Sequence, residues 1–167
     1  PSDVIDSDEL EMPHKYKIRG EKWGFHRTDV LKQFPFPNFS GVYIPESIVW
    51  NAIALRYKKR FINETLRIYY STILKADRLT TKMKQGQHIQ GRWLYHKENL
   101  NLYIRYAIYD PVGFLKSAVN YVRFSLHKGI GFGKQWRELT NWKAKILYVI
   151  ALPVGCLMYL KDKRRVI

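Results

Sequence analysis

The sequence predicts a mixed fold, α+β or α/β, in which short strands and helices over residues 1–80 precede a basic α-helical region over residues 81–167. Three patterns lead to this prediction. Residues 61–70 alternate apolar and polar side chains, as a strand does. Residues 48–57 repeat apolar side chains at the spacing of an amphipathic helix. Beyond Thr80 only the helical spacing recurs.

The first part begins with weakly patterned sequence. Residues 1–20 are polar and lack sustained periodicity, which indicates loop or edge structure. Residues 21–31 predict a short strand that runs into a helical turn, with Thr28 or Asp29 as its N-cap. Prolines and a glycine within residues 34–41 disfavour regular structure, so this segment is predicted to be a loop rich in aromatic residues.

A helix and a strand complete the first part. Pro45 fits the first turn of a helix, where a missing backbone N–H costs nothing, and the apolar face continues through Tyr57. A basic turn over residues 58–60 then leads into the strand over residues 61–70.

The second part predicts helices separated by a glycine-rich linker. An apolar stripe over residues 100–108 ends at Asp110-Pro111, a pair that can cap and open the next helix. That next helix has its stripe over residues 112–126, and the glycines of residues 129–133 end the pattern. A third apolar run covers residues 146–160, interrupted by a proline and a glycine.

Positive charge is concentrated in the second part. The chain has 29 Lys and Arg against 14 Asp and Glu, a net charge of +15. Residues 1–80 hold 13 basic against 10 acidic side chains, whereas residues 81–167 hold 16 against 4. An excess confined to one part implies an anionic partner there, which is either nucleic acid or an anionic membrane surface.

The single cysteine and the N-terminal sequence favour a cytosolic setting. Cys156 has no second cysteine with which to form a disulfide or a thiolate metal cluster. The first residues contain neither a basic n-region nor an apolar h-region of a signal peptide. Because the chain opens on Pro1 and not on methionine, we expect it to have been cut from a longer protein.

The apolar run over residues 146–160 has two interpretations. At 15 residues it is shorter than the roughly 20 that a helix needs to span a bilayer. Basic residues flank it on both sides, and aromatic residues lie nearby, which is typical of a segment at a cytoplasmic membrane face. A buried C-terminal helix packed on the rest of the chain explains the run equally well. The aromatic residues are Trp136, Trp142, Tyr148 and Tyr159.

Four segments of the first part carry a family resemblance. They are Trp23 to Leu31, Phe36-Pro37, Val42 to Trp50 and Phe61 to Tyr70. In order and spacing these segments resemble the C-terminal half of bacterial family 2 glycosyltransferases. The resemblance covers residues 20–80 and implies the C-terminal part of a GT-A type domain, so that residues 1–80 would be its acceptor-side half.

The resemblance also implies a chemistry. Enzymes of this family transfer a sugar from a nucleotide-activated donor to an acceptor hydroxyl with inversion, and Glu46 matches the position of their catalytic base. An alcohol needs such a base, because it is a poor nucleophile near neutral pH. The family usually has an acidic pair here, whereas this chain has Ser47 after Glu46. On spacing alone, Glu46 is also a plausible first-turn glutamate that is stabilised by the helix dipole.

Three further residues are candidates for binding the acceptor. Trp50 lies one helical turn after Glu46, where an indole can stack on a sugar ring, although a core tryptophan is an equally good interpretation. His26 and Arg27 are candidates for contacting a phosphate or the acceptor, with a solvated basic edge as the alternative.

A divalent cation, Mg²⁺ or Mn²⁺, is expected for the full-length enzyme, because it would neutralise the donor diphosphate. Asp6 and Asp8 form an Asp-x-Asp sequence of the kind that holds this ion. The family motif ends an apolar strand far upstream of the base, so we predict no metal site within this chain. The donor and metal half would be missing, and we expect the isolated chain to be inactive.

The expected function is therefore that of a fragment of an inverting glycosyltransferase in surface polysaccharide, lipopolysaccharide or cell-wall glycan synthesis. Its partners would be a nucleotide-sugar donor, a glycan or lipid-linked acceptor, and the anionic inner face of the cytoplasmic membrane, where it would be peripheral. The alternative is a basic nucleic-acid-binding or protein-interaction module without catalysis. Nucleic acid is disfavoured because the aromatic residues lie on helical apolar stripes and no recognised nucleic-acid motif occurs.

Overall fold

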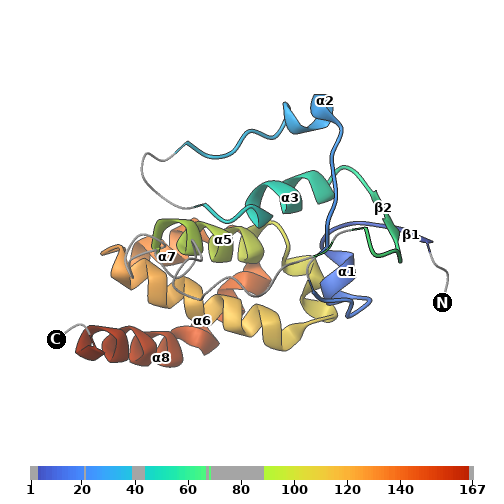
Figure 1. The fold of residues 1–167 in the computed structure, drawn as a ribbon. Coiled ribbons are helices and arrows are strands. Elements are labelled where there is room, and N and C mark those ends of the chain that lie inside the picture. The colour runs from blue at the N-terminus through green and yellow to red at the C-terminus, as the bar shows by residue number, and fades with distance from the viewer. Residues whose placement is uncertain (1–3, 21, 39–43, 67, 69–88, 166–167) are drawn as a thin grey trace. The chain divides into compact units, whose positions relative to one another are not determined.

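The computed structural model describes residues 4–20, 22–38, 44–66, 68 and 89–165. Over these residues the fold is mixed α+β and mostly helical, which confirms the α+β alternative at the level of fold class (Figure 1). The chain divides into two compact units, residues 1–40 with 46–87 and residues 41–45 with 88–167. The boundary expected at residue 80 lies outside the described residues.

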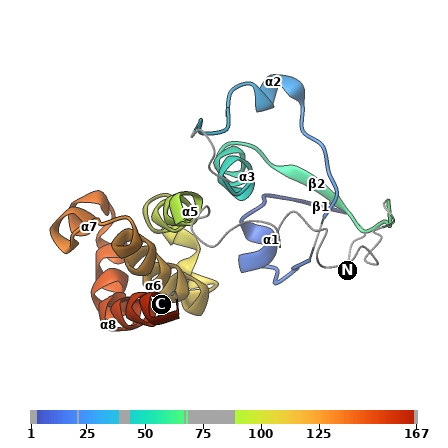
Figure 2. The ribbon, with the colours of Figure 1, turned by 60° about the vertical axis from the view of Figure 1, so that its left-hand side comes forward.

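The first unit contains a two-stranded antiparallel sheet (Figure 2). Strand β1 (Val4–Ser7) pairs with β2 (Lys59–Ile62), and the register places Ser7 opposite Lys59. The short helix α1 (Glu11–His14) follows β1. Residues 1–20 therefore hold an edge strand and one helical turn, which is more structure than their polar composition indicated.

Of the two strands predicted for the first unit, one is shorter than expected and the other does not occur among the described residues. The strand expected over residues 61–70 ends at Ile62, which pairs with Val4, the first described residue of β1. Residues 63–66 and 68 are irregular, and the remainder lies outside the described residues. Residues 22–27 are also irregular. An alternating pattern does not supply a partner strand, and a strand without one has unpaired backbone groups.

The two predicted helices of the first unit are present. Helix α2 (Thr28–Leu31) is a single turn, with Arg27 at the N-cap position in place of the expected Thr28 or Asp29. Helix α3 (Ser47–Ala54) begins directly after Glu46. It buries Ile48, Val49 and Ile53, as its spacing predicts. The family resemblance extends beyond these elements into residues that are not described.

Helix α6 (Pro111–His127) is the centre of the second unit, where α5 (Ile89–Asn101) and α8 (Trp142–Arg165) both pack against it (Figure 2). Asp110 caps α6 as predicted, since its carboxylate accepts a hydrogen bond of 3.0 Å from the Gly113 N–H. Residues such as Tyr121 and Val122 are fully buried, so α6 forms the core of this unit.

The elements around α6 differ from the predicted ones. One helix was expected over residues 100–108, but α5 covers Ile89–Asn101 and a 3₁₀-helix, η2, covers Ile104–Ile108. The glycine-rich linker predicted over residues 129–133 is shorter than expected. Gly129 has φ of 71° and Gly131 is the N-cap of α7 (Phe132–Glu138), so that Gly133 already lies in a helix.

Helix α8 is longer than the apolar run that indicated it. It has 24 residues and continues through Pro153, which the sequence pattern treats as an interruption. By length and composition, Trp142–Arg164 qualifies as a candidate membrane span, which the run of 15 residues did not. Its contact with α6 is close, because a Cβ atom at Gly155 would lie 2.6 Å from the Val122 Cβ. The Asp162 carboxylate accepts two hydrogen bonds from Arg123, of 2.5 and 2.7 Å.

Candidate functional site

Glu46 stands at the N-terminal end of α3. Its backbone carbonyl accepts hydrogen bonds from the N–H groups of Val49 and Trp50, at 3.0 and 3.1 Å, so the helical turn already includes it. Its side chain is exposed and makes no capping hydrogen bond to the helix. The carboxylate is thus held at a fixed helix end and remains open to solvent, where a second molecule can reach it.

An aromatic cluster surrounds Trp50, one turn further along α3. The imidazole of His26 stacks on the indole, with ring centroids 4.4 Å apart and planes 13° apart. Phe36 meets the indole edge-on at 6.0 Å, and the Lys59 ammonium lies 5.7 Å from the indole centroid. Trp50 therefore fastens the irregular segments that contain His26 and Phe36 to α3. One face of its indole is already covered by His26.

His26 sits in this cluster as a neutral ring. Burial lowers the pKa of His26, and the positive charge of Lys59 lowers it further. Its Nε2 atom is buried and has no hydrogen-bond partner among the described residues. A neutral imidazole cannot offer a positive charge to a phosphate, but it can exchange one hydrogen bond with a hydroxyl group. His26 is thus half-buried against Trp50 and is not part of a solvated basic edge, while its expected contact with a phosphate or the acceptor stays a prediction.

Arg27 has a different partner. Its guanidinium donates two hydrogen bonds to Asp29, at 3.1 and 2.8 Å, and the two side chains are 81% and 61% exposed. The described contacts of Arg27 thus belong to the start of α2 and not to the cluster around Trp50. They fit the solvated basic edge that was the alternative interpretation.

Asp6 and Asp8 do not fit a divalent cation. The Asp6 carboxylate accepts two hydrogen bonds from Arg60, at 2.8 and 2.7 Å, and this bonding is the main cause that lowers the pKa of Asp6. The Asp8 carboxylate accepts from the backbone N–H groups of Leu10 and Glu11, at 2.9 and 2.7 Å. Both carboxylates are engaged in holding β2 and α1. No group of three or more potential metal ligands occurs among the described residues.

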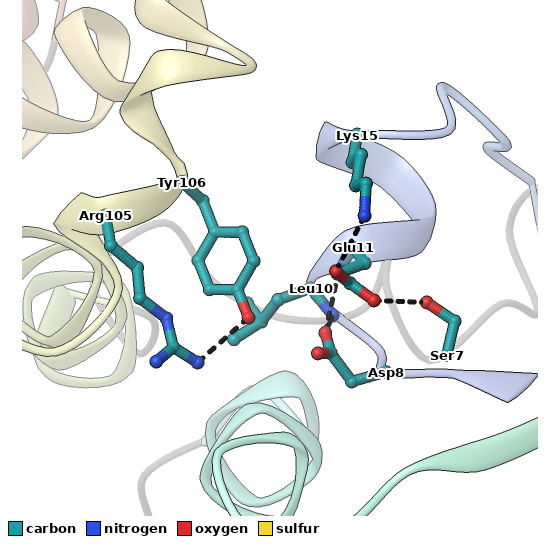
Figure 3. A network of polar contacts seen from close by, with 7 residues as sticks. All are labelled: Ser7, Asp8, Leu10, Glu11, Lys15, Arg105 and Tyr106. Atoms are coloured by element: carbon teal, nitrogen blue, oxygen red, sulfur yellow. Dashed lines mark hydrogen bonds and ion pairs between the residues drawn. The ribbon is translucent and has the colours of Figure 1, made fainter.

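Figure 3 shows the polar groups that fix the start of α1. The Ser7 hydroxyl donates to Glu11 at 2.8 Å, and Lys15 donates to the same carboxylate at 3.1 Å. These bonds lower the pKa of Glu11, with the one from Ser7 contributing most. The figure also shows a contact within the second unit, where Arg105 donates to the Tyr106 hydroxyl at 3.0 Å.

Lys59 and Glu9 are site residues that the sequence did not reveal. The Lys59 ammonium bonds to the Glu9 carboxylate at 2.8 Å while it lies near the Trp50 ring. The two residues are fifty positions apart and meet because β1 pairs with β2. The only sequence signal was the basic turn over residues 58–60, which does not indicate a partner.

No family model, curated protein or solved structure matches this chain. The interpretation of the site therefore rests on its own geometry and on the resemblance of the four sequence segments.

A second polar cluster is buried in the second unit, between α5 and α6. The Nδ1 atom of His96 lies 2.8 Å from the Ser117 hydroxyl, to which Asn99 also donates at 3.2 Å. The His96 ring lies parallel to Phe124, with centroids 5.8 Å apart. Burial lowers the pKa of His96 to about 4, and the nearby Arg92 and Arg123 add to this shift. This cluster joins two helices of the core.

Proposed function

We propose that this chain is the acceptor-side part of an inverting glycosyltransferase of the family 2 type, with a GT-A type fold in the complete protein. It would move a sugar from a nucleotide-sugar donor to an acceptor hydroxyl, in the synthesis of surface polysaccharide, lipopolysaccharide or cell-wall glycan. The observation that carries the proposal is the exposed Glu46 carboxylate at the start of α3, one turn from the Trp50 cluster.

Glu46 supplies the base that this reaction needs. As the new bond to the sugar forms, the acceptor oxygen must lose its proton, and a carboxylate within hydrogen-bond reach can take it. Glu46 is fixed through its backbone, since α3 buries Ile48 and Val49 immediately after it. The carboxylate is thus carried by a rigid element and is open to solvent, where an acceptor could reach it.

The aromatic cluster shapes the surface beside this base. Trp50 fastens the segments of His26 and Phe36 to α3, so these segments keep their position while an acceptor approaches. Trp50 is half-buried, and the part of its indole that remains accessible would offer an apolar contact to the C–H face of a sugar. The His26 ring, stacked on the indole, would keep this surface in place beside the acceptor. Arg27 has no part in the proposed contact.

The site in this chain does not extend to the donor. A divalent cation belongs to the full-length enzyme in this proposal, and Asp6 and Asp8 are not its ligands. The acceptor is a glycan or a lipid-linked glycan, and the enzyme works as a peripheral protein at the inner face of the cytoplasmic membrane. The basic second unit would hold it there.

Glu46→Gln tests the assignment in the complete protein. This change keeps size and polarity but removes the base, so it should lower transfer at least about 100-fold while protein level and nucleotide-sugar binding stay unchanged. Glu46→Asp keeps a carboxylate and should retain measurable activity. The readout is the surface glycan of the source cell after replacement of the gene by each variant, with nucleotide-sugar binding measured on the purified proteins.

Glu64→Gln is the matched control, since Glu64 is an exposed glutamate in the irregular segment after β2. It should leave the glycan unchanged. Normal glycan levels with Glu46→Gln would exclude Glu46 as the base.

A further inference from the structure

Helix α8 presents an uncovered apolar face to solvent. Six aliphatic side chains along it are between 49% and 66% exposed, and from the first of them to the last the helix rises by about 21 Å. We call them the outer face of α8. They are Ile146, Val149, Ile150, Val154, Leu157 and Leu160. A contiguous apolar patch of this kind on an otherwise strongly charged unit indicates a binding surface.

The opposite side of α8 is occupied by α6. Ala144, Tyr148 and Ala151 are buried, and Gly155 lies against Val122. Near the C-terminal end, Asp162 is bound by Arg123 and lies 2.9 Å from the His127 Nε2 atom. These contacts follow the helix from Tyr148 to Asp162, so α8 is attached to α6 along most of its length.

The charges around the outer face identify its partner. Exposed basic residues lie at both ends of α8, and the only acidic residue of the helix, Asp162, is paired with Arg123. A second copy of this chain would bring an equal excess of positive charge to the contact. Nucleic acid would pair with the basic residues but would leave the aliphatic strip uncovered. An anionic lipid surface satisfies both features. These exposed residues are Lys143, Lys161, Lys163 and Arg164, and the half-buried Lys145 adds to them.

We propose that α8 lies lengthwise in the headgroup region of an anionic membrane, with its outer face in the acyl chains and α6 above it on the aqueous side. This inference rests on the proposed membrane location and states which surface of the chain would contact the membrane. It does not depend on the role of Glu46. Trp142 is 66% exposed and lies at the interface, whereas Tyr148 is buried against α6 and Tyr159 packs on His127 at 4.9 Å. The last two are therefore not interfacial residues, in contrast to the sequence-based expectation.

An in-plane helix explains the structure better than a spanning one. Basic residues flank both ends, whereas a spanning helix has its basic excess on the cytoplasmic side. The uncharged stretch between Lys145 and Lys161 has 15 residues, which is short of the roughly 20 that cross the hydrocarbon core. A spanning α8 would also draw α6, which packs along it and carries the exposed Lys116, toward the lipid interior.

Vesicle binding by the purified chain tests the proposal. The chain should co-sediment with phosphatidylcholine vesicles that contain phosphatidylglycerol, bind less when salt is raised, and bind little to vesicles of phosphatidylcholine alone. The double variant Ile146→Gln/Leu157→Gln removes two residues of the outer face and should weaken binding about tenfold or more. Exposed positions tolerate glutamine, so helical circular dichroism should not change.

The matched control is Ile108→Gln/Val112→Gln, which makes the same chemical change at two exposed residues of the same unit, 79% and 60% exposed. It should bind vesicles like the unsubstituted chain. Equal losses in both double variants would overturn the outer face as the contact, and so would the absence of vesicle binding by the unsubstituted chain. Neither result would affect the outcome of Glu46→Gln.

Depth measurements separate the two orientations. In a Cys156→Ala background, single cysteines at positions 146, 154 and 160 carry spin labels, and their depth in the vesicle is measured by collision with lipid-soluble and water-soluble relaxants. An in-plane helix gives three similar, shallow depths. A label at position 154 that is much deeper than the other two would show a spanning helix and overturn the proposal.

Discussion

His96 is the residue whose burial has the clearest thermodynamic consequence. Its pKa falls from 6.5 to about 4 in the folded protein, because burial disfavours the charged ring. Folding thus favours the neutral form. The stability that depends on a neutral His96 is complete above pH 6.5, the pKa of histidine in the unfolded chain. It is lost as the pH falls toward 4.

The expected loss at pH 4 is roughly 3 kcal/mol, taken at 1.36 kcal/mol for each pKa unit. Replacing His96 with glutamine should reduce the loss of stability between pH 6.5 and 4, which is the acid limb of the stability curve. This holds even if the change lowers stability at pH 7. The free energy of unfolding between pH 4 and 8 is measured by denaturant unfolding, followed by helical circular dichroism. An unchanged acid limb in His96→Gln would show that another group is responsible.

Glu98 lies on α5, as His96 does, and its pKa shift predicts a pH dependence of stability with the opposite sign. Burial raises its pKa from 4.5 to about 7. The stability linked to this carboxyl is complete below pH 4.5 and is lost as the pH rises through 7. Glu98→Gln should therefore gain stability over the unsubstituted chain above pH 7 and show no gain at pH 4. The two variants together separate a histidine effect from a general response of α5 to pH.

At the scale of elements, the contact between α6 and α8 depends on Gly155. An added Cβ atom would lie 2.6 Å from the Val122 Cβ and 3.0 Å from the Val119 carbonyl oxygen. Gly155→Ala should lower the free energy of unfolding by about 1–2 kcal/mol, although alanine is the better helix former. Thermal or denaturant unfolding checks this value.

The control for Gly155→Ala is Gly133→Ala in α7. A Cβ atom at Gly133 would have no heavy atom within 4 Å, so only the helix preference remains. This change should be neutral or stabilising by up to about 1 kcal/mol. Similar losses at both glycines would mean that the close approach of α8 to α6 is not the cause.

The sequence predicts elements whose signals are local and misses those that depend on a partner. The helix from Pro111 was predictable because its cap, its first-turn proline and its stripe stand together, and so was α3. Strand β1 was not, because its pairing with β2 compensates for a polar sequence. Helix α8 continues through Pro153 because α6 supports it, and periodicity does not detect such support.

The same distinction between local signals and contacts with a distant segment applies to the candidate site. Glu46 and Trp50 were predictable as neighbours, since they lie four residues apart on one helix. The stacking of His26 on Trp50 and the approach of Lys59 join segments far apart in the chain, and no local pattern indicates them. The engagement of Asp6 by Arg60 likewise required the strand register.

At the scale of the whole molecule, the net charge of +15 makes competition between polyanions informative. If the second unit is a lipid-binding unit, anionic vesicles should bind more tightly than double-stranded DNA or structured RNA. Nucleic-acid binding should depend more steeply on salt, because counterion release is its main driving force, whereas apolar burial adds a salt-independent part to vesicle binding. Tighter binding to nucleic acid at physiological salt would favour the non-catalytic alternative.

In the proposed membrane-bound state, Pro153 would limit the depth that α8 reaches in the bilayer. Proline has no backbone N–H, so the Val149 carbonyl cannot receive the usual helical hydrogen bond from position 153. Val149 belongs to the outer face, and in dry hydrocarbon an unpaired carbonyl costs several kcal/mol. At the headgroup boundary, water can reach that oxygen at little cost. In the proposed in-plane arrangement, Pro153 would therefore favour a shallow position of α8 at the boundary between headgroups and acyl chains, where water still reaches the Val149 carbonyl.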